Sequence, residues 1–378
     1  MNKNMQKKYT ALGLMSGTSG DGVDASIVVS NGKDQFEVIN NKYFEYDQDI
    51  YKNIHTLKET IHSLKDLKKY SSDLLNLEKK ITLFHAMAIQ DISKNNKIDI
   101  IGFHGQTIYH NSKEKISNQL GDGKLLSQLT KRKVVYNFRK NDIDNGGEGA
   151  PLTPIFHQLI ANKIKLDLPA IILNIGGISN ATIIAAHKDK SLIMSRDIGP
   201  GNCMIDMWVR KNSKYKFDID GKLASLGKIN NLIYDQALEL FGNKIIEDKT
   251  FSLDINDFDI SFIRGLSLED GAATLTELTA RIIGSSLSFN VTKIKKKICK
   301  VLVCGGGRKN KFFMKKIKEN SLKNFVIQPI DDYGLDGDFI ESQAFAFLAV
   351  RSFLKLPISF PKTTGCLKPC SGGELVEN

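Results

Sequence analysis

The chain has 378 residues, of which 41% are hydrophobic and 25% are charged, and its mean hydropathy is −0.21. This composition excludes a mainly disordered chain, and the length predicts two domains or one large α/β unit. No apolar run approaches the ~20 residues of a membrane helix and the start lacks an apolar signal core, so a soluble cytoplasmic protein without a membrane partner is expected. The net charge of +11 comes mainly from scattered lysines, which favours a solvated surface over a nucleic-acid partner.

The first half of the chain reads as strands around a small-residue turn, followed by helices and two further strands. In chain order we expect a strand from about residue 11, a turn, strands through 28–29 and at 36–46, long helices within 48–94, a buried strand at 98–103 that ends at His104-Gly105-Gln106, a helix at 124–130 and a strand at 134–138.

The same order recurs in the second half. The expected elements are a strand, turn and strand within 169–186, a strand at 191–199, helices over roughly 200–290, a buried strand at 300–304 that ends in glycines before a helix, a strand at 324–330 and a closing helix at 339–354. A duplicated α/β unit with a cleft between the copies explains this repeat. We place the first domain at 1–137 plus a C-terminal helix at about 350–368, and the second at 138–349.

Two turns occupy matching positions in the two halves, Ser16 to Gly22 and Asn174 to Gly177. Glycines and short hydroxyl side chains let backbone N–H groups approach a phosphate chain without a clash, so the pair is typical of a nucleotide site. Asp21 and Asp24 in the first turn could hold Mg²⁺ directly or through water. Plain hairpins remain the alternative, which the matching positions make less favoured.

Two further glycine motifs follow strands in the second half. In DIGPGN, Gly199, Gly201 and Asn202 precede a helix whose first N–H groups could bind an oxyanion. Asp197 is either the N-cap of that helix or a general base, and the sequence does not decide between the two. In CGGGRKN, Gly305, Gly306 and Gly307 could let an adenosine lie against the backbone, although this motif alone is weak.

Polar side chains cluster between 102 and 154 among glycines. They suit a sugar or another polyhydroxylated ligand with a carboxylate that Arg139 could clamp, whereas a well-capped loop is the alternative. The candidates are His104, Gln106, Thr107, Arg139, Asp142, Asp144 and Glu148. Glu341 lies near the start of the closing helix, where it either complements the helix dipole or has a role toward the substrate.

Five cysteines, an odd number without a CxxC pair, indicate reduced thiols. Cys366 and Cys370 could be half of a metal site. No paired His or Cys stands near them in the sequence, so the pattern disfavours such a site.

Taken together, the motifs resemble those of the anhydro-N-acetylmuramic acid kinases, within the superfamily of sugar kinases, heat-shock chaperones and actin. The resemblance covers nearly the whole chain in order. It rests on MSGTSGDGVD, FHGQTIYH, GGEGAPLTP, LNIGGISN, DIGPGN, ATLTELTA, CGGGRKN, ESQAFAFLA and FPKTTG. It implies two RNase H-like domains of the actin and hexokinase type and a homodimer.

The resemblance further implies an enzyme that opens 1,6-anhydro-N-acetylmuramic acid with water and phosphorylates O6 from ATP during peptidoglycan recycling. Asp197 matches the base that activates water, and Glu341 would orient the sugar or the water. The His104 and Asp142 regions would bind the sugar, and Gly305 to Gly307 the adenosine. The first turn would bind the ATP phosphates and Mg²⁺ through Gly17, Thr18, Ser19, Gly20, Asp21, Gly22, Val23 and Asp24. The second turn would bind the nucleotide from the other side through Asn174, Gly176 and Gly177.

The sequence departs from the family pattern at several positions. Gly20 stands where Leu or Met is usual, Glu148 where Gln is frequent, and the segment 249–257 differs from the family's usual run. Two other functions compete with the family's reaction. A plain sugar kinase would phosphorylate a free hydroxyl, and an ATPase of the actin or chaperone kind would be indifferent to sugars.

Overall fold

The computed structural model describes residues 7–187, 189–247, 252–291 and 298–377. The chain divides into two compact units, the first comprising Met1–Lys165 and Asp338–Asn378 and the second Leu166–Gly337. The boundaries expected after 137 and near 350 are therefore wrong. Residues 138–165 and 338–349 belong to the first unit, because the helices there pack within it: Phe156 contacts Phe36 and Phe347.

The first unit is built on a mixed sheet in the order β12-β6-β4-β1-β2-β3, with β5 paired to β4. The first three strands form an antiparallel meander, β4 and β6 run parallel to β1, and β12 pairs antiparallel with β6. The bounds are β1 (Tyr9–Ser16), β2 (Gly22–Ser30), β3 (Phe36–Glu45), β4 (Ile100–Asn111), β5 (Ile116–Leu120), β6 (Lys133–Tyr136) and β12 (Glu374–Val376).

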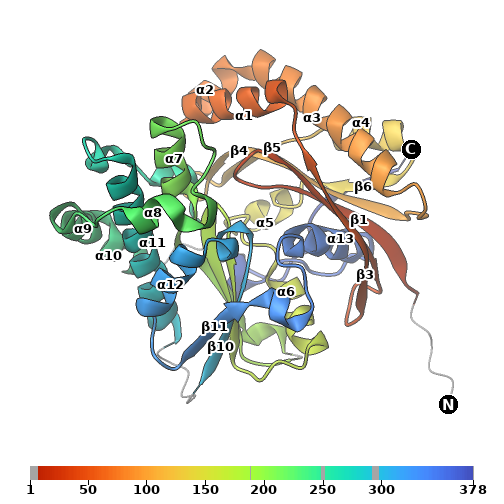
Figure 1. Ribbon diagram of the computed structural model, residues 1–378. Coiled ribbons are helices and arrows are strands. Elements are labelled where there is room, and N and C mark those ends of the chain that lie inside the picture. The colour runs from red at the N-terminus through yellow and green to blue at the C-terminus, as the bar shows by residue number, and fades with distance from the viewer. Residues whose placement is uncertain (1–6, 188, 248–251, 292–297, 378) are drawn as a thin grey trace. The chain divides into compact units, whose positions relative to one another are not determined.

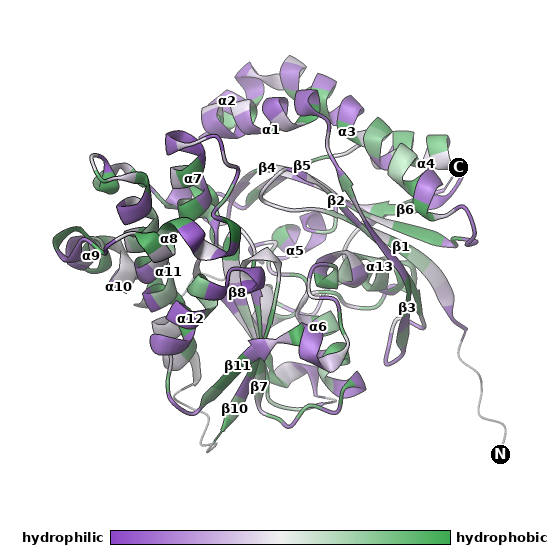
Figure 2. Ribbon diagram, in the orientation of Figure 1, coloured by the Kyte–Doolittle hydropathy of each residue, from purple (hydrophilic) through white to green (hydrophobic). Residues whose placement is uncertain are grey.

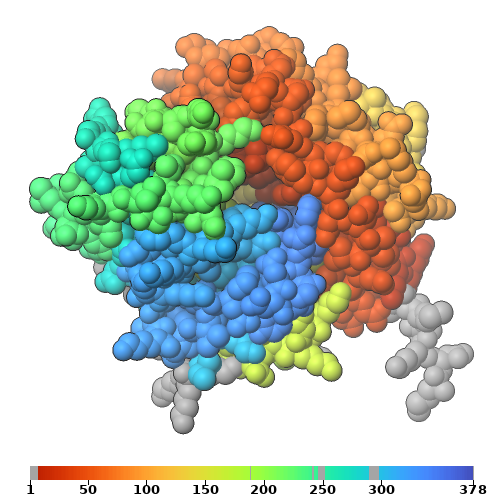
Figure 3. Space-filling model, viewed as in Figure 1, coloured from red at the N-terminus to blue at the C-terminus, as the bar shows by residue number. Residues whose placement is uncertain are grey.

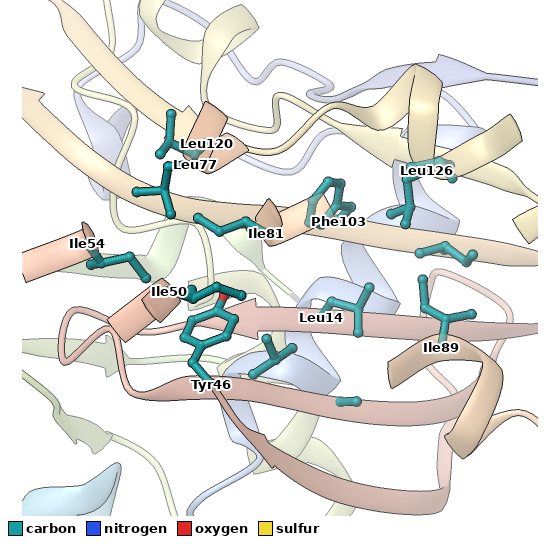
Figure 4. Close-up of a cluster of buried hydrophobic side chains, with 14 of the residues drawn as sticks. Leu14, Tyr46, Ile50, Ile54, Leu77, Ile81, Ile89, Phe103, Leu120 and Leu126 are labelled. Atoms are coloured by element: carbon teal, nitrogen blue, oxygen red, sulfur yellow. The ribbon is translucent and has the colours of Figure 1, made fainter. Parts of the chain in front are cut away.

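Helices of the N-terminal part cover one face of this sheet (Figure 1). They are α1 (Gln48–Thr60), α2 (Leu64–Lys69), α3 (Ser71–Ile92) and α4 (Gly123–Thr130). Figure 4 shows how Ile50 and Ile54 of α1 and Ile81 of α3 point toward Leu14 and Phe103 of the sheet. The side chains in this cluster are buried, so the hydrophobic effect fixes the helices on the sheet.

Helix α13 (Ile340–Phe353) packs on β1, β2 and β4 of the same sheet. Glycines on the sheet make this close approach possible, because a Cβ atom at Gly13 would lie 1.9 Å from the carbonyl oxygen of Ser342. A Cβ atom at Gly102 would likewise lie 2.3 Å from the carbonyl oxygen of Phe345. The remaining helices of this unit are α5 (Lys140–Asp144), α6 (Pro154–Lys163) and α14 (Pro361–Thr364).

The second unit repeats the plan with a sheet in the order β11-β10-β7-β8-β9. Its first three strands again form an antiparallel meander, and β10 and β11 again run parallel to the first strand of the unit. The bounds are β7 (Ala170–Ile175), β8 (Ile178–Ile184), β9 (Ile193–Pro200), β10 (Cys299–Cys304) and β11 (Phe325–Pro329). The repeated strand order confirms the expected duplication of an α/β unit.

Helices α11 (Leu268–Val291) and α12 (Lys311–Glu319) pack on this second sheet through a cluster that includes Ile283, Phe313 and Ile317. Strands β10 and β11 are largely hydrophobic in Figure 2, and their residues Val301, Val303 and Ile327 are buried in this cluster. A second cluster surrounds the buried Trp208. It involves α7 (Cys203–Asn212), α8 (Lys222–Leu226), α9 (Asn231–Ala237) and α11, and α10 (Asn243–Glu247) completes the helices.

Most expected elements are confirmed, with one difference that concerns the site. β4 does not end at His104 but runs on to Asn111, where it pairs with β5. The sequence also failed to indicate β5, α6 and β12. Among the described residues, no helix combines the length and the apolar character that a membrane span needs.

Candidate functional site

The turn between β1 and β2 is a tight turn whose backbone conformation favours glycine at position 20. The Gly20 N–H donates to the Gly17 carbonyl at 3.1 Å, and Gly20 has a φ of +62°. A Cβ atom there would lie 2.8 Å from Cγ2 of Ile54. A Leu or Met in this left-handed conformation would be strained and would crowd Ile54, so the glycine that departs from the family pattern suits the local geometry of the turn.

Buried side chains hold this first glycine turn, which we define as residues 17–21. The Ser16 hydroxyl lies 2.5 Å from Oε1 of Gln106 and accepts a hydrogen bond from the Tyr46 hydroxyl at 3.0 Å. Gln106 Nε2 donates to the Gly17 carbonyl at 3.0 Å, and Lys58 Nζ donates to the Thr18 carbonyl at 2.8 Å. Gln106, expected to bind sugar, is thus fully buried and engaged with this turn. The sequence carried no motif that would have pointed to Tyr46 or Lys58.

The carboxylates of Asp21 and Asp24, which are expected to hold Mg²⁺, both raise the pKa of the Tyr43 phenol. Burial, followed by Asp21, Glu45 and Asp24, raises the pKa of Tyr43 well above its usual range, so negative charge is concentrated near this side chain. The Ser19 hydroxyl also donates to Oδ1 of Asp21 at 2.6 Å. Oxygen donors of this kind suit a divalent cation. Val23, in contrast, has its side chain in the hydrophobic core, which leaves only its backbone for a ligand.

His104 and Arg139 are brought into contact. Arg139 Nη2 lies 3.0 Å from His104 Nε2, and His104 Nδ1 lies 2.8 Å from the carbonyl oxygen of Gly105. Burial, with the Arg139 charge beside it, lowers the pKa of His104 to about 3. A neutral imidazole therefore carries its proton on Nδ1, donates to Gly105 and accepts from Arg139, which orients the guanidinium.

The other candidates of this region divide between the interior and the surface. Asp142 is 1% exposed: its Oδ2 accepts from the Gly149 N–H at 2.8 Å, and its Oδ1 accepts from the Thr364 hydroxyl at 2.6 Å. This carboxylate holds the loop, as the alternative interpretation of the sequence proposed. Glu148 and Thr107 are partly exposed, and Asp144 is exposed at the end of α5.

In the second unit, the turn between β7 and β8 accepts hydrogen bonds from the start of α7. The N–H groups of Asn202 and Gly201 donate to the carbonyls of Gly176 and Gly177, both at 2.8 Å. A Cβ atom at Gly201 would lie 2.2 Å from the Gly176 carbonyl oxygen, so this approach requires glycine. The N–H groups of Gly201 and Asn202, which precede the helix, therefore bind within the protein.

Asp197 lies within β9 and is 7% exposed. It is not the N-cap of α7, because Asn202 occupies that position, so the capping alternative is wrong. Oδ2 of Asp197 accepts a hydrogen bond from the Leu253 N–H at 2.8 Å. Leu253 belongs to the segment that departs from the family pattern, and residues 249–251 of that segment lie outside the described part of the chain.

The glycines after β10 pack on the turn between β7 and β8. Gly305 has a φ of +82°, and a Cβ atom there would lie 2.5 Å from Oδ1 of Asn174. A Cβ atom at Gly307 would lie 2.2 Å from Cγ2 of Ile175. At Gly306, in contrast, no described atom outside its two chain neighbours lies within 4 Å of the Cβ position. Gly306 therefore offers open space against which a flat group could lie.

A pocket of about 420 Å³ lies beside α12, whose residues belong to the blue part of the colour scale in Figure 3. Side chains of α12 line it together with Arg308 and Pro329. None of the predicted nucleotide-binding residues lines this pocket. Glu341 lies in the first turn of α13 in the first unit and is partly exposed, so its role stays a prediction.

Comparisons with known proteins show which family the chain is similar to. The family model for anhydro-N-acetylmuramic acid kinase matches residues 9–378. The chain is 54% identical over 376 residues to an anhydro-N-acetylmuramic acid kinase of Pelagibacter ubique, which covers 99% of this chain and 100% of the relative. It is 39% identical over 377 residues to an anhydro-N-acetylmuramic acid kinase of Zymomonas mobilis. This match covers 97% of this chain and 99% of the relative.

Among solved structures, a ROK family glucokinase from Streptomyces griseus, in complex with glucose and AMPPNP, is similar with a TM-score of 0.41 at 12% identity. The match covers 90% of this chain and 99% of the glucokinase. The family match is far more specific and extends over almost the entire sequence. The chain therefore belongs to the anhydro-N-acetylmuramic acid kinase family.

Proposed function

We propose that the chain transfers the γ-phosphoryl group of ATP to O6 of 1,6-anhydro-N-acetylmuramic acid while water opens the anhydro bridge. The product is N-acetylmuramic acid 6-phosphate. Family membership makes the protein an anhydro-N-acetylmuramic acid kinase, an enzyme of cell-wall recycling.

The residues of the first glycine turn fit a phosphate chain with its cation. Among the described atoms outside its two chain neighbours, a Cβ atom at Gly17 would meet Oγ of Ser19 alone, at 4.0 Å, so the backbone there is accessible to a ligand. Asp21 and Asp24 supply the oxygen donors that Mg²⁺ requires. When bound, ATP supplies the phosphoryl group and Mg²⁺ neutralises its charge. Gly306 would accommodate the adenosine.

Sugar binding is assigned to Arg139, which His104 orients. The lactyl carboxylate of the substrate is a suitable partner for a guanidinium, which binds carboxylates through two parallel hydrogen bonds. The partly exposed Thr107 and Glu148 can add hydrogen bonds to hydroxyl or amide groups. Asp142 contributes by holding the loop and does not need to touch the sugar.

Asp197 is assigned as the general base. Its carboxylate would take a proton from water as the water oxygen bonds to C1 and the bond from C1 to O6 breaks. O6 then acquires the phosphoryl group rather than a proton, so one carboxylate suffices where a glycosidase uses two. The observation that carries this assignment is the location of Asp197 in a strand, with the Leu253 N–H fixing one oxygen.

The decisive experiment measures ADP release from Mg-ATP with and without the anhydro sugar, in water enriched in oxygen-18. Sugar-dependent ADP release with oxygen-18 at C1 supports the proposal. Phosphorylation without that label would indicate a plain sugar kinase. ADP release that is indifferent to sugar would indicate an ATPase of another kind.

Asp197→Asn should lower kcat by about 10²- to 10⁴-fold with little change in ATP binding, because the amide cannot accept the proton. The matched control is Asp218→Asn in the same unit. Asp218 is also buried and accepts from the N–H groups of Leu223 and Ala224 at 2.8 and 3.0 Å. A general effect of losing a buried carboxylate would lower both activities alike and would count against Asp197 as the base.

A further inference from the structure

Three side chains of the first unit bring metal-ligating atoms together in the interior. The carboxylate of Asp142 and the thiols of Cys366 and Cys370 lie with one atom each within 4.8 Å of one another. The three residues are 1%, 1% and 6% exposed. The sequence disfavoured a metal site at the two cysteines because no further ligand stands near them. The fold supplies that ligand from 228 positions upstream of Cys370.

Hydrogen bonds hold these residues in place. Asp142 is on α5, and the Thr364 hydroxyl donates to its Oδ1 at 2.6 Å. Cys370 forms an isolated bridge with Ser359, whose Oγ lies 3.0 Å from its Sγ. Contacts of this kind to a ligating carboxylate orient it and are usual around metal sites in proteins.

The donor set selects the class of metal. Two sulfur atoms and one carboxylate oxygen favour a soft or borderline cation, whereas Mg²⁺ and Ca²⁺ require oxygen ligands alone. In the described part of the chain, Asp142 contacts N–H, hydroxyl and thiol groups and forms no ion pair with Lys or Arg. The carboxylate therefore has no described cationic side chain that would compete with a metal ion.

We propose that Asp142, Cys366 and Cys370 bind one zinc ion. Binding forms two Zn–S bonds and one Zn–O bond, and the two thiol protons leave to solvent. The net charge of the cluster therefore stays at −1, as it is with two thiols and one carboxylate. Water or the Ser359 hydroxyl completes the tetrahedral coordination that zinc prefers.

The ion would have a structural role. The Glu148 N–H donates to the Thr364 carbonyl at 2.8 Å, and the Leu367 N–H donates to the Asn145 carbonyl at 3.1 Å. Zinc would therefore reinforce a junction that already joins the loop carrying Glu148 to the C-terminal segment. This inference does not depend on the proposed reaction.

The test is a zinc titration of the reduced, metal-free, full-length protein without an affinity tag, in competition with a chromophoric chelator. We expect one tightly bound zinc ion per chain, and none in the Cys366→Ser/Cys370→Ser variant. The matched control is Cys299→Ser/Cys304→Ser, which also removes two buried thiols, from β10. This control should bind zinc like the original protein.

X-ray absorption at the zinc edge keeps the proposal testable if the double variant does not fold. The original protein should show two sulfur neighbours at about 2.3 Å. Zinc surrounded only by nitrogen and oxygen would overturn the proposal. So would the absence of stoichiometric zinc, equal binding by the Cys366→Ser/Cys370→Ser variant, or a disulfide between these cysteines in protein kept under reducing conditions.

Discussion

Gln106 has both ends of its side-chain amide committed to the first glycine turn. Its Oε1 lies 2.5 Å from the Ser16 hydroxyl, and its Nε2 donates to the Gly17 carbonyl. A polar side chain that is buried in this way stabilises the particular backbone conformation whose groups it satisfies. Asp142 and Asp197 do the same for their loops by accepting backbone N–H groups.

Gln106→Leu should therefore affect nucleotide binding more than sugar binding. The change leaves the Gly17 carbonyl without this donor, and loss of a buried partner costs about 1–3 kcal/mol. If the turn binds ATP, we expect KM for ATP to rise by about tenfold with a much smaller change for the sugar. Steady-state kinetics with each substrate varied in turn measures both values.

The control for this variant is Gln343→Leu, a buried glutamine on α13 in the same unit whose Nε2 reaches Asn41 only at 3.4 Å. It should leave KM for ATP unchanged. A rise in KM for the sugar alone in the Gln106 variant would instead support the sugar contact that the sequence predicted.

At the scale of elements, the sequence revealed those whose apolar pattern is local. The first two strands of each meander are largely apolar runs around small-residue turns, and they lie where the sequence predicts them. Helix α6 escaped detection because its residues Pro154 to Ala161 are all buried, which removes the one-sided pattern of an amphipathic helix. β12 has only three residues and exists through its pairing with β6.

For the candidate site, too, the sequence revealed the features that have a local pattern and missed those that depend on packing. Motifs indicated the glycine turns and Asp197, because each of these features belongs to a short run of neighbouring residues. They could not indicate that the start of α7 donates its N–H groups to Gly176 and Gly177, or that Leu253 reaches Asp197. Such contacts depend on how separate elements pack, and no local spacing encodes them.

The contact between α13 and β1 makes a prediction at this scale. Gly13→Ala should lower the free energy of unfolding by about 1–3 kcal/mol or more, because the added methyl group would overlap the backbone of Ser342 and Ala346. Urea unfolding followed by circular dichroism measures the loss. Gly306→Ala has open space around the new methyl group and should change stability by less than about 0.5 kcal/mol. Equal stability of the two variants would contradict this account of the packing.

At the scale of the whole molecule, the two units differ in their buried histidines. Burial lowers the pKa of four histidines, His85 to about 4 and His104, His110 and His157 to about 3. All four belong to the first unit. The second unit contains the only tryptophan, Trp208, which is buried and donates to the Leu268 carbonyl at 2.9 Å.

Mild acid should therefore weaken the first unit before the second. The four histidines titrate near 6.5 in the unfolded chain and lower in the folded chain, so below pH 6.5 the unfolded state binds more protons. The four neutral imidazoles therefore leave the free energy of unfolding unchanged above pH 6.5 and lower it as the pH falls toward 4. The loss is up to about 1.4 kcal/mol for each histidine and each pH unit.

Hydrogen exchange at pH 7 and pH 5, corrected for intrinsic rates, measures this difference between the units. Protection in β4 should fall with pH while protection in β7 and the fluorescence of Trp208 change less. His85→Met should make the loss in the first unit less steep, because Met cannot take up a proton, whereas His62→Met, at an exposed position, should not. Equal acid sensitivity of β4 and β7 would show that the buried imidazoles do not control the response, since the second unit contains none of the four.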